Sequence, residues 1–399
     1  TFFLCLLASF LTAVVQAFAP SYTTFVIIRF VFAAFKLGLY TMAFILCTEL
    51  VGPSRRAFVG QFLNVYYAAG YMLLAPIAYF IRDWRNPQLT ITAALVPFFL
   101  LFPFIPESAR WLISRNRFDE AEKIIKKMAT VNKVKLPDNA MEALKSEEQD
   151  NEELQRVSNV PQRYTYLTAF RTPRLRSRTF NLLLAWFVIN MVYYGIALST
   201  SDLGVDHYIA FFVSGAVEIP AYISSILTLH YVGRRLPLCA YLVTAGTACM
   251  ATSIFGPGVE KTVIAMIGKF CITAAFSVIY IYTAELYPTP IRSMGLCLCS
   301  MMARVSGIIC PFILELGMIW QQLPYIIFGA FSICSGLFIL LLPETLNSPL
   351  PETVEEAENF RDNSCLCIKR RHHQEKLEYL AQGGGDMKNT EGEQSYAEL

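Results

Sequence analysis

Long runs of apolar residues, separated by short polar stretches, recur along most of the chain. A helix needs about 20 apolar residues to cross a bilayer, because each residue adds about 1.5 Å of length. The runs that approach or exceed this length are residues 2–19, 24–48, 59–81, 89–105, 179–199, 206–230, 237–255, 261–284, 294–319 and 323–342. The pattern therefore predicts an all-α protein, a polytopic transmembrane helical bundle in a lipid bilayer.

The composition agrees with this prediction and argues against several other classes of protein. Of the 399 residues, 55% are hydrophobic and 16% are charged, whereas about 25% of the residues in a soluble domain are charged. The net charge of +2 gives no basic excess, so we expect no nucleic acid partner. The eleven cysteines lack metal-ligand spacing, and no Walker-type GxxxxGK[ST] sequence occurs. We see no set of nucleophile, base and orienting group, so we predict no enzyme, no ATP-driven pump and no cofactor.

The positive residues of the loops predict which helix ends face the cytosol, because Arg and Lys gather in short cytosolic loops. The arginines that occupy alternate loops are Arg55, Arg56, Arg234, Arg235 and Arg292. The loop at 82–88, with two arginines and an aspartate, is the exception. We therefore expect a multi-pass protein of the plasma membrane, with the segment 106–178 and the C-terminus in the cytosol.

These patterns divide the chain into four predicted parts. Residues 1–105 are expected to form the last four helices of an N-terminal bundle, 106–178 a cytosolic loop, 179–342 a C-terminal bundle of six helices, and 343–399 a mostly disordered cytosolic tail. The loop begins with ESARWLISRNRFDEAEKIIKKMA, in which apolar residues recur at helical spacing. We therefore expect amphipathic helices at the start of this loop.

Two motifs occur twice in the chain at nearly the same offset. Glu49 in TEL and Glu285 in TAEL lie 236 positions apart, and PES at 106–108 lies 237 positions before PET at 343–345. Two motifs at one offset indicate a duplicated half, as in transporters built from two bundles. Projected back by this offset, the first two helices of the second half fall before residue 1. The repeat therefore predicts a protein of twelve spans, ten of which this chain contains.

Several longer motifs resemble one known family. They are NVYYAAGYMLLAPIAYFIRDWR (64–85), PESARWLISRNRFDEAEKII (106–125), EIPAY (218–222), VGRR (232–235), GKFCITAAFSVIYIYTAELYPTPIRSMG (268–295) and LLPET (341–345). Together they resemble the major facilitator superfamily and, within it, solute carrier family 22, the organic cation, organic anion and carnitine transporters. The carnitine-type members are the most similar in motif. The resemblance implies the major facilitator fold and transport of small organic ions by alternating access.

Two acidic residues, Glu49 and Glu285, lie at the predicted cytosolic ends of two helices and allow two interpretations. An ionisable group near the membrane is costly unless it is paired or hydrated. One reading is a set of gating ion pairs, with members Glu49, Arg55, Glu285, Arg292, Arg234 and Arg235. The other concerns Tyr282, which lies three residues before Glu285 and therefore on the same helix face. For these two positions the resemblance implies a sodium site, as in sodium-coupled carnitine-type members.

Arg304 lies well inside a predicted span, where an arginine indicates a functional site or a buried ion pair, for example with Glu315. Its planar guanidinium suits a carboxylate. The resemblance implies the same role, because anion and carnitine types have Arg at this position and cation types have Asp. Tyr222, in EIPAY, matches the carnitine types, whereas anion types have Lys there.

Aromatic residues are candidates for a cage around a quaternary ammonium group. They are Tyr40, Tyr66, Tyr67, Tyr71, Tyr193, Tyr194, Phe276 and Tyr280, although aromatic residues at helical spacing also serve as packing. Lys36 departs from the family pattern. It would favour a doubly anionic substrate, or it would pair with Glu218. Arg29 and Lys269 are expected to snorkel toward the membrane surface.

The leading interpretation is a secondary-active transporter of carnitine-like zwitterions or carboxylates, with sodium coupling through Glu285 as an option. One alternative is an organic anion or cation transporter of the same family. Another, from a different class, is a membrane receptor or scaffold that does not transport. The expected partners are a small organic ion and the bilayer.

Overall fold

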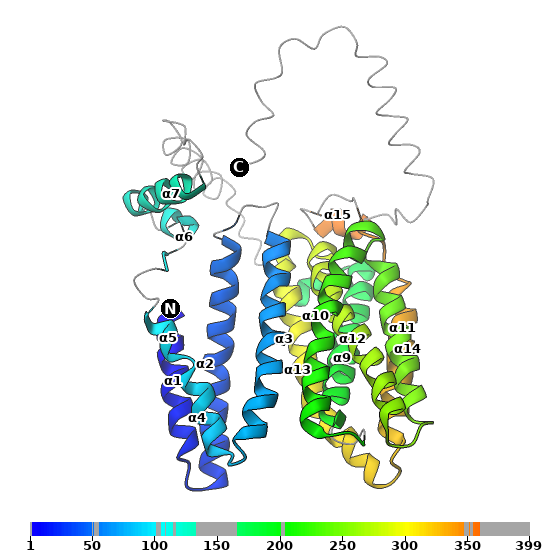
Figure 1. The fold of residues 1–399 in the computed structure, drawn as a ribbon. Helices are drawn as coiled ribbons and strands as arrows, with labels where there is room; N and C mark the ends of the chain where they lie inside the picture. The colour runs from blue at the N-terminus through cyan, green and yellow to red at the C-terminus, as the bar shows by residue number, and fades with distance from the viewer. Residues whose placement is uncertain are drawn as a thin grey trace. The chain divides into compact units, whose positions relative to one another are not determined.

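The computed structural model describes residues 2–49, 51, 56–100, 105–107, 109–114, 117–132, 166–200, 204–346, 351 and 354–359. Every regular element in these ranges is a helix, so the prediction of an all-α fold is confirmed (Figure 1). The chain divides into two compact units. The N-terminal unit comprises Thr1–Leu63 and Ile77–Gln162, and the C-terminal unit comprises Asn64–Pro76 and Arg163–Leu399.

The N-terminal unit contains the early helices of the chain. They are α1 (Phe2–Ala17), α2 (Tyr22–Glu49), α4 (Arg85–Ala93), α5 (Val96–Leu100), α6 (Ala109–Ser114) and α7 (Phe118–Asn132). Helix α1 packs against α2 and α4, and α6 packs against α7. Helix α3 (Arg56–Phe80) has its ends in this unit, whereas its middle belongs to the C-terminal unit.

The helix predicted over 89–105 is interrupted. Helix α4 ends with the amide of Ala94 donating to the carbonyl of Thr90, and α5 starts two residues later at Val96. Pro97 follows, and its ring would clash with the preceding turn of a continuous helix, where it also lacks an N–H to donate. Pro97 lies at this break, but Pro76, Pro220 and Pro311 lie inside continuous helices, so proline alone does not decide where a helix ends.

The start of the predicted cytosolic loop is helical, as its periodicity indicated. Leu112 of α6 and Ala121 of α7 are buried. The guanidinium of Arg117 binds Glu120 at 2.6 Å, and Asp119 and Glu120 lie in the first turn of α7, where the helix dipole favours negative charge. Residues 133–165 of this loop and residues 360–399 of the predicted tail lie outside the described part.

The C-terminal unit is a bundle of long helices. They are α9 (Pro173–Leu198), α10 (His207–Tyr231), α11 (Arg235–Thr252), α12 (Val259–Leu286), α13 (Arg292–Glu315) and α14 (Leu323–Ile339), followed by the short α15 (Val354–Asn359). Helix α12 contacts α9, α10, α11 and α13, and α14 packs against α9 and α11. The first of these helices begins at residue 173, within the predicted loop 106–178.

Small residues allow two of these helices to approach closely. A Cβ atom on Gly246 of α11 would lie 2.7 Å from the carbonyl oxygen of Gly329 of α14, and one on Gly329 would lie 2.8 Å from the carbonyl oxygen of Gly246. Glycine and other small residues serve this purpose in membrane helices, because apolar association inside lipid depends on close packing. The α11–α14 contact is therefore specified by glycine.

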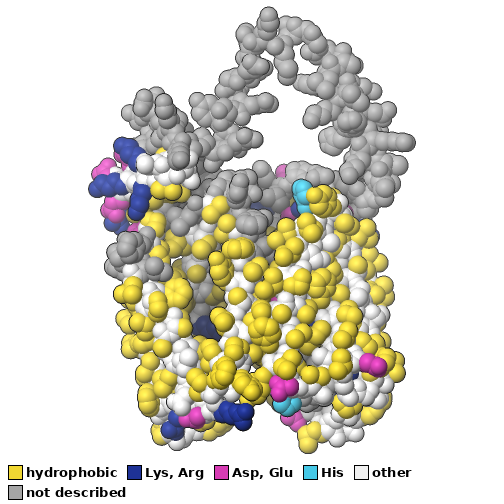
Figure 2. Space-filling view, viewed as in Figure 1, with side chains coloured by type: hydrophobic (Ala, Val, Ile, Leu, Met, Phe, Trp, Pro, Cys, Tyr) yellow, Lys and Arg dark blue, Asp and Glu magenta, His cyan; other side chains and the backbone are white. Residues whose placement is uncertain are grey.

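The outer surface of the bundle is apolar. Phe180, Leu227 and Phe312 are among many large apolar side chains that are exposed, and Figure 2 shows such side chains over much of the visible face. Patches of this kind mark contact with lipid or another apolar partner. In the described residues, five helices are long and apolar enough to cross a membrane: Tyr22–Cys47, Pro173–Leu198, His207–Tyr231, Val259–Leu286 and Thr289–Met318. Phe2–Ala17 and Leu323–Ile339 are shorter apolar helices.

Candidate functional site

Arg304 lies in the middle of α13 on its exposed side. The opposite face of the helix packs inward through the buried residues Cys299, Ala303, Ser306 and Cys310. Within the described residues, Arg304 makes no hydrogen bond and no ion pair, and Glu315 is not its partner. A guanidinium in an apolar helix is costly unless it meets water, a partner or a ligand. The site is therefore built around an arginine with free donors.

Asn190 of α9 holds the turn of α13 that carries Arg304. Its side-chain amide donates to the carbonyl of Ala303 and, at 3.0 Å, to the hydroxyl of Ser306. One turn along α9, the ring of Tyr194 lies 3.8 Å from where a Cβ atom on Gly307 would be. Since Gly307 lies one turn after Arg304, Tyr194 is positioned beside the same stretch of α13.

An aromatic cluster extends from Tyr194 into the bundle. The ring centroid of Tyr193 lies 5.6 Å from that of Tyr194 and 6.1 Å from that of Phe276. Phe276 lies 5.2 Å from Tyr280, whose ring lies 4.4 Å from that of Trp186. Four of the predicted cage residues of this unit are therefore in one cluster: Tyr193, Tyr194, Phe276 and Tyr280.

Trp186 is a member that the sequence reasoning missed. It is fully buried, and its indole N–H donates to the hydroxyl of Thr283 at 2.9 Å. A tryptophan at the centre of an apolar run, away from the helix ends where membrane tryptophans gather, was the available signal. Its bond to Thr283 fixes the ring against which Tyr280 packs.

Lys269 and Glu218 form a buried ion pair behind this cluster. Lys269 Nζ lies 2.9 Å from Glu218 Oε1, and neither side chain has any exposed surface. The hydroxyl of Tyr193 donates to the same oxygen at 2.7 Å, and Lys269 Nζ lies 3.4 Å from the centre of the Tyr193 ring. The expectation that Lys269 snorkels is therefore wrong, because Glu218 holds its charge inside the bundle. Glu218 also has a different partner from the Lys36 that the sequence suggested.

The cytosolic motifs of the C-terminal unit meet at the ends of α11 and α12. Arg234 binds Glu285 through Nε and Nη2, both at 2.9 Å, and the hydroxyl of Thr345 donates to the same carboxylate at 2.5 Å. The carboxylate of Glu344 accepts the amides of Arg234 and Arg235, at the N-terminus of α11, each at 3.0 Å. Negative charge is stabilised at such a terminus. The VGRR, TAEL and PET motifs thus form one polar network.

Two expectations about Glu285 are changed by this network. Arg234 is its cationic partner, whereas Arg292 donates to the carbonyl of Tyr287 and to the hydroxyl of Thr289, each at 3.3 Å. Tyr282, the other proposed sodium ligand, is buried and donates to the carbonyl of Pro343 at 2.7 Å. Both proposed ligands therefore already have protein partners. In the described residues no group of three or more His, Cys, Asp or Glu side chains could hold a metal ion.

The glycine of VGRR allows this network to form. Gly233 has a φ of +112°, a conformation that other residues rarely adopt. A Cβ atom there would also lie 3.0 Å from the carboxylate of Glu344. Any larger residue would strain the turn and push Glu344 away from the α11 N-terminus.

The chain after the bundle folds back onto the start of α9. Both carboxylate oxygens of Glu358 in α15 accept amides at the N-terminus of α9, from Arg174 and from Leu175, each at 3.0 Å. The guanidinium of Arg174 donates to the carbonyl of Glu358 at 3.2 Å. Glu358 therefore satisfies two of the amides that every helix leaves free at its first turn.

The other predicted site residues lie elsewhere. Lys36 and Tyr40 are exposed on one face of α2, one turn apart. Tyr67 is exposed on α3, and Tyr222 is buried in α10. Glu49 ends α2, but its side chain and Arg55 lie outside the described part.

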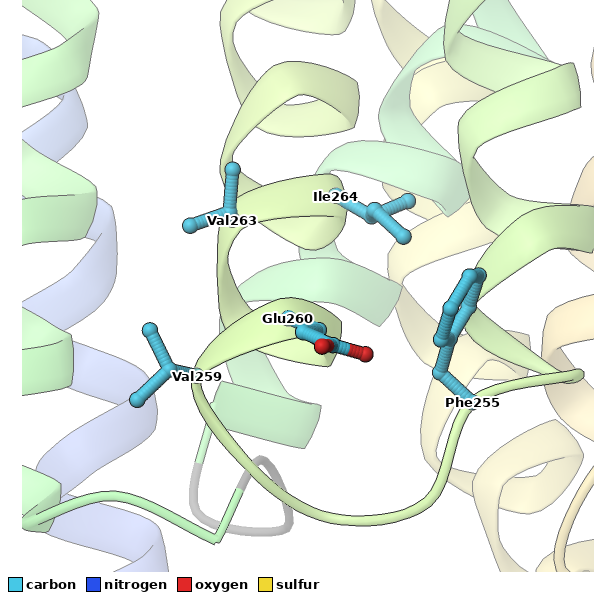
Figure 3. A pocket seen from close by; sticks show the side chains of 5 residues that line it. All are labelled: Phe255, Val259, Glu260, Val263 and Ile264. Carbon is cyan, nitrogen blue, oxygen red and sulfur yellow. The ribbon is translucent and has the colours of Figure 1, made fainter.

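An open depression of about 360 Å³ lies at the turn between α11 and α12. Figure 3 shows its lining residues, which are Phe255, Val259, Glu260, Val263 and Ile264. None of them is a predicted substrate or ion-coupling residue, so the depression is separate from the candidate site.

Comparisons with known proteins identify the family of the chain. The family of "Sugar (and other) transporter" proteins matches residues 1–357. The chain is 42% identical over 363 residues to "Organic cation transporter protein" of Drosophila melanogaster, covering 90% of this chain and 66% of that protein. It is 39% identical over 354 residues to "Solute carrier family 22 member 3" of Mus musculus, which covers 88% of this chain and 62% of that protein. It is 37% identical over 345 residues to human "Organic cation/carnitine transporter 2", which covers 86% of this chain and 60% of that protein.

The fold is similar to that of the inward open xylose transporter XylE from E. coli, with a TM-score of 0.64 at 17% identity, covering 89% of this chain and 81% of that one. This likeness shows that the chain has the fold of that transporter, and the family match together with the long apolar helices shows a multi-pass membrane protein. The chain belongs to the sugar (and other) transporter family, and the expected resemblance to solute carrier family 22 is confirmed. Its relatives are transporters and not enzymes, as predicted. The chain spans 60–66% of the length of these three relatives.

Proposed function

We propose that the protein is a secondary transporter of small organic ions that carry a carboxylate, and that Arg304 binds this carboxylate. The observation that supports the proposal is an exposed arginine in the middle of α13, without a protein partner in the described residues. A guanidinium presents two parallel N–H donors, which match the two oxygens of a carboxylate. A ligand of this kind would supply the counter-charge that Arg304 lacks.

A carnitine-like zwitterion fits the surroundings of Arg304. The rings of Tyr194, Phe276 and Tyr280 are partly or largely exposed and belong to one cluster. Aromatic faces attract quaternary ammonium groups. A substrate with a carboxylate at one end and an ammonium group at the other would use Arg304 and this cluster together. Transport would follow alternating access, in which two bundles rock around a fixed site.

Coupling to sodium and residence in the plasma membrane stay predictions. Sodium at Glu285 would have to displace Arg234 or share the carboxylate with it, because Arg234 and Thr345 occupy both oxygens. A gating role for Glu285 needs no such displacement. It requires only that the contacts with Arg234 break and reform during the cycle.

A second candidate function is transport of organic anions or cations. A relative 42% identical to the chain is named as an organic cation transporter, which favours cations. The positive charge of Arg304 opposes a simple cation, and Lys36 would favour a dianion. A receptor or scaffold that does not transport is the alternative from another class.

Uptake measurements separate these candidates. Cells would express the chain as printed and a version extended at its N-terminal end by the two helices that the repeat predicts. Labelled carnitine, tetraethylammonium and glutarate would be offered with sodium and with sodium replaced. We expect carnitine uptake; glutarate uptake instead, abolished by Lys36→Gln, would support the anion candidate. Tetraethylammonium uptake alone would support the cation candidate, and no uptake of any probe would favour the receptor or scaffold.

A further inference from the structure

Only the nitrogen of the Asn190 side-chain amide has partners in the described residues. Its Nδ2 atom donates to the carbonyl of Ala303 and to the hydroxyl of Ser306, both on α13. Its Oδ1 atom accepts no hydrogen bond from the described part of the chain. An amide oxygen has two lone pairs and can accept two hydrogen bonds. Asn190 therefore uses both of its donors and keeps an unused acceptor.

The partners of Asn190 decide which atom of the amide faces α13. The oxygen and the nitrogen of an amide are nearly the same in shape, so their assignment depends on the surrounding hydrogen bonds. The carbonyl of Ala303 can only accept, so the atom in contact with it must be the Nδ2 donor. Asn190 is 4% exposed, and Oδ1 is not one of the fully buried side-chain atoms that lack a partner. Oδ1 is therefore directed away from the Ala303 carbonyl and is open to a ligand or to water.

Gly307 places this amide beside the turn that carries Arg304. A Cβ atom on Gly307 would lie 3.5 Å from Asn190 Nδ2 and 3.8 Å from the ring of Tyr194. Gly307 follows Arg304 by three residues, and it lies between the buried face of α13 at Ala303 and the exposed side at Arg304. Since glycine has no side chain, α13 leaves the edge between Asn190 and Arg304 open.

The groups at this edge differ in what they can bind. The guanidinium of Arg304 only donates, Asn190 Oδ1 only accepts, and the ring of Tyr194 is 37% exposed. A ligand that contacts all of them needs a carboxylate, a hydrogen-bond donor close to it, and a group that packs on an aromatic face. A quaternary ammonium group has no N–H to donate. In a zwitterion of the carnitine type the donor must therefore be a hydroxyl group.

The geometry points to Asn190 as the residue that selects substrates with a hydroxyl group close to their carboxylate. The inference rests on the proposed function, since it concerns the substrate whose carboxylate Arg304 binds. The substrate hydroxyl donates to Asn190 Oδ1, while the guanidinium of Arg304 donates to the carboxylate. A site that accepts a hydrogen bond from a substrate hydroxyl disfavours the analogue without it, because the polar group of the site is then left unpaired.

Carnitine and γ-butyrobetaine provide the test. Carnitine carries a hydroxyl between its carboxylate and its ammonium group, and γ-butyrobetaine is the same molecule without this hydroxyl. Labelled forms of both would be offered at low concentration to cells that express the chain, as printed and extended by the two predicted helices. The ratio of the two initial uptake rates is the measured quantity, because it cancels differences in expression. For wild type we expect a ratio of about 3–10 in favour of carnitine, the usual effect of one hydrogen bond.

Two variants remove the Oδ1 acceptor. Asn190→Leu keeps the approximate size of the side chain without its polar atoms, and Asn190→Ala is a smaller alternative if leucine prevents folding. The ratio should fall close to one in both, whatever happens to the absolute rates. Ser306→Ala is the matched control, because it removes one acceptor of Asn190 Nδ2 and leaves Oδ1 in place. Its ratio should stay at the wild-type value.

Two results would overturn the inference. A wild type that carries carnitine and γ-butyrobetaine at the same rate, a result that depends on no variant, would show that water alone satisfies Oδ1. Asn190 variants that lose both rates equally and keep the wild-type ratio would show that Asn190 only holds α13 in position. A wild type that carries neither compound would instead contradict the proposed transport of carnitine-like substrates, on which the inference depends.

Discussion

Arg234 at the start of α11 and Glu285 at the end of α12 form an ion pair of 2.9 Å, with side chains that are 18% and 17% exposed. The pair joins two helices of the C-terminal unit. It is supported by Thr345, which donates to Glu285, and by Glu344, which accepts the Arg234 amide. Three motifs that lie far apart in the sequence therefore meet around Arg234 and Glu285.

Arg234→Ala should destabilise the C-terminal unit, because it leaves the Glu285 carboxylate largely buried without its cation. We expect a loss of about 1–3 kcal/mol, below the range for fully buried pairs because of the partial exposure. Arg292→Ala is the matched control, since the bonds of Arg292 within the described part of the chain go to Tyr287 and Thr289, each at 3.3 Å. Thermal unfolding in detergent measures both variants. Equal losses would show that the Arg234–Glu285 pair carries no special weight.

Removing one member of the Lys269–Glu218 pair should cost more than removing both. Lys269→Met leaves a buried carboxylate without its counter-charge, for which about 3–5 kcal/mol is typical. The double variant Lys269→Met/Glu218→Gln keeps the volume and removes both charges, so much of this loss should be recovered. The same thermal unfolding assay, with the two single variants and the double variant, gives the coupling between the residues. Additive losses would contradict the ion pair.

Gly246→Ala should loosen the contact between α11 and α14. The new methyl group would meet the Gly329 carbonyl oxygen at 2.7 Å, a backbone atom that cannot move aside. Overpacking of this kind costs about 1–3 kcal/mol. Gly70→Ala in α3 is the control, because no atom of the described residues lies within 4 Å of its Cβ position. Alanine there should stabilise the helix by about 0.5–1 kcal/mol. Thermal unfolding that falls equally in both variants would contradict the close approach.

The docking of α15 on α9 should weaken in acid. Burial would raise the pKa of Glu358, but the amides of Arg174 and Leu175 and the charge of Arg174 outweigh it and hold this pKa below its usual value. A carboxylate with a lowered pKa stabilises the folded state above its unfolded pKa and loses this effect as the pH falls through the folded pKa. Hydrogen exchange of the Arg174 and Leu175 amides should therefore accelerate as the pH falls below about 4, relative to the intrinsic rate.

Glu358→Gln is the control for this titration. It keeps the size of the side chain and removes the charge, so exchange at the α9 N-terminus should be faster at neutral pH and should show little further change in acid. A wild type whose protection is the same at neutral and acid pH would contradict the role of the Glu358 charge.

Hydrophobic patterning was sufficient to predict the helices, because apolar length is nearly all that a membrane helix requires. Each of the ten predicted ranges contains helix in the described residues. The break between α4 and α5 was not predicted, because an average over a long window does not detect a local interruption of this kind. Trp186 was missed for a similar reason, since a tryptophan in an apolar run also reads as packing.

The partners of charged residues were harder to predict from the sequence than the positions of the helices. The sequence indicated that the Glu285 carboxylate needs a partner, and the predicted topology places both Arg234 and Arg292 at the same side of the membrane. The packing of α11 on α12 decides between them. Lys269 was expected to snorkel because it lies toward one end of its span. Its true partner, Glu218, lies 51 positions away in α10, and sequence spacing within one helix carries no information about such a contact.

The most direct test of the account is substrate preference after reversal of charge at Arg304. Uptake of labelled carnitine and of tetraethylammonium would be measured for wild type, Arg304→Asp and Arg304→Lys, at equal surface expression. We predict that wild type prefers carnitine, that Arg304→Lys keeps this preference with weaker uptake, and that Arg304→Asp prefers tetraethylammonium. An Arg304→Asp variant with the same ratio of carnitine to tetraethylammonium uptake as wild type would contradict the binding of a substrate carboxylate by Arg304.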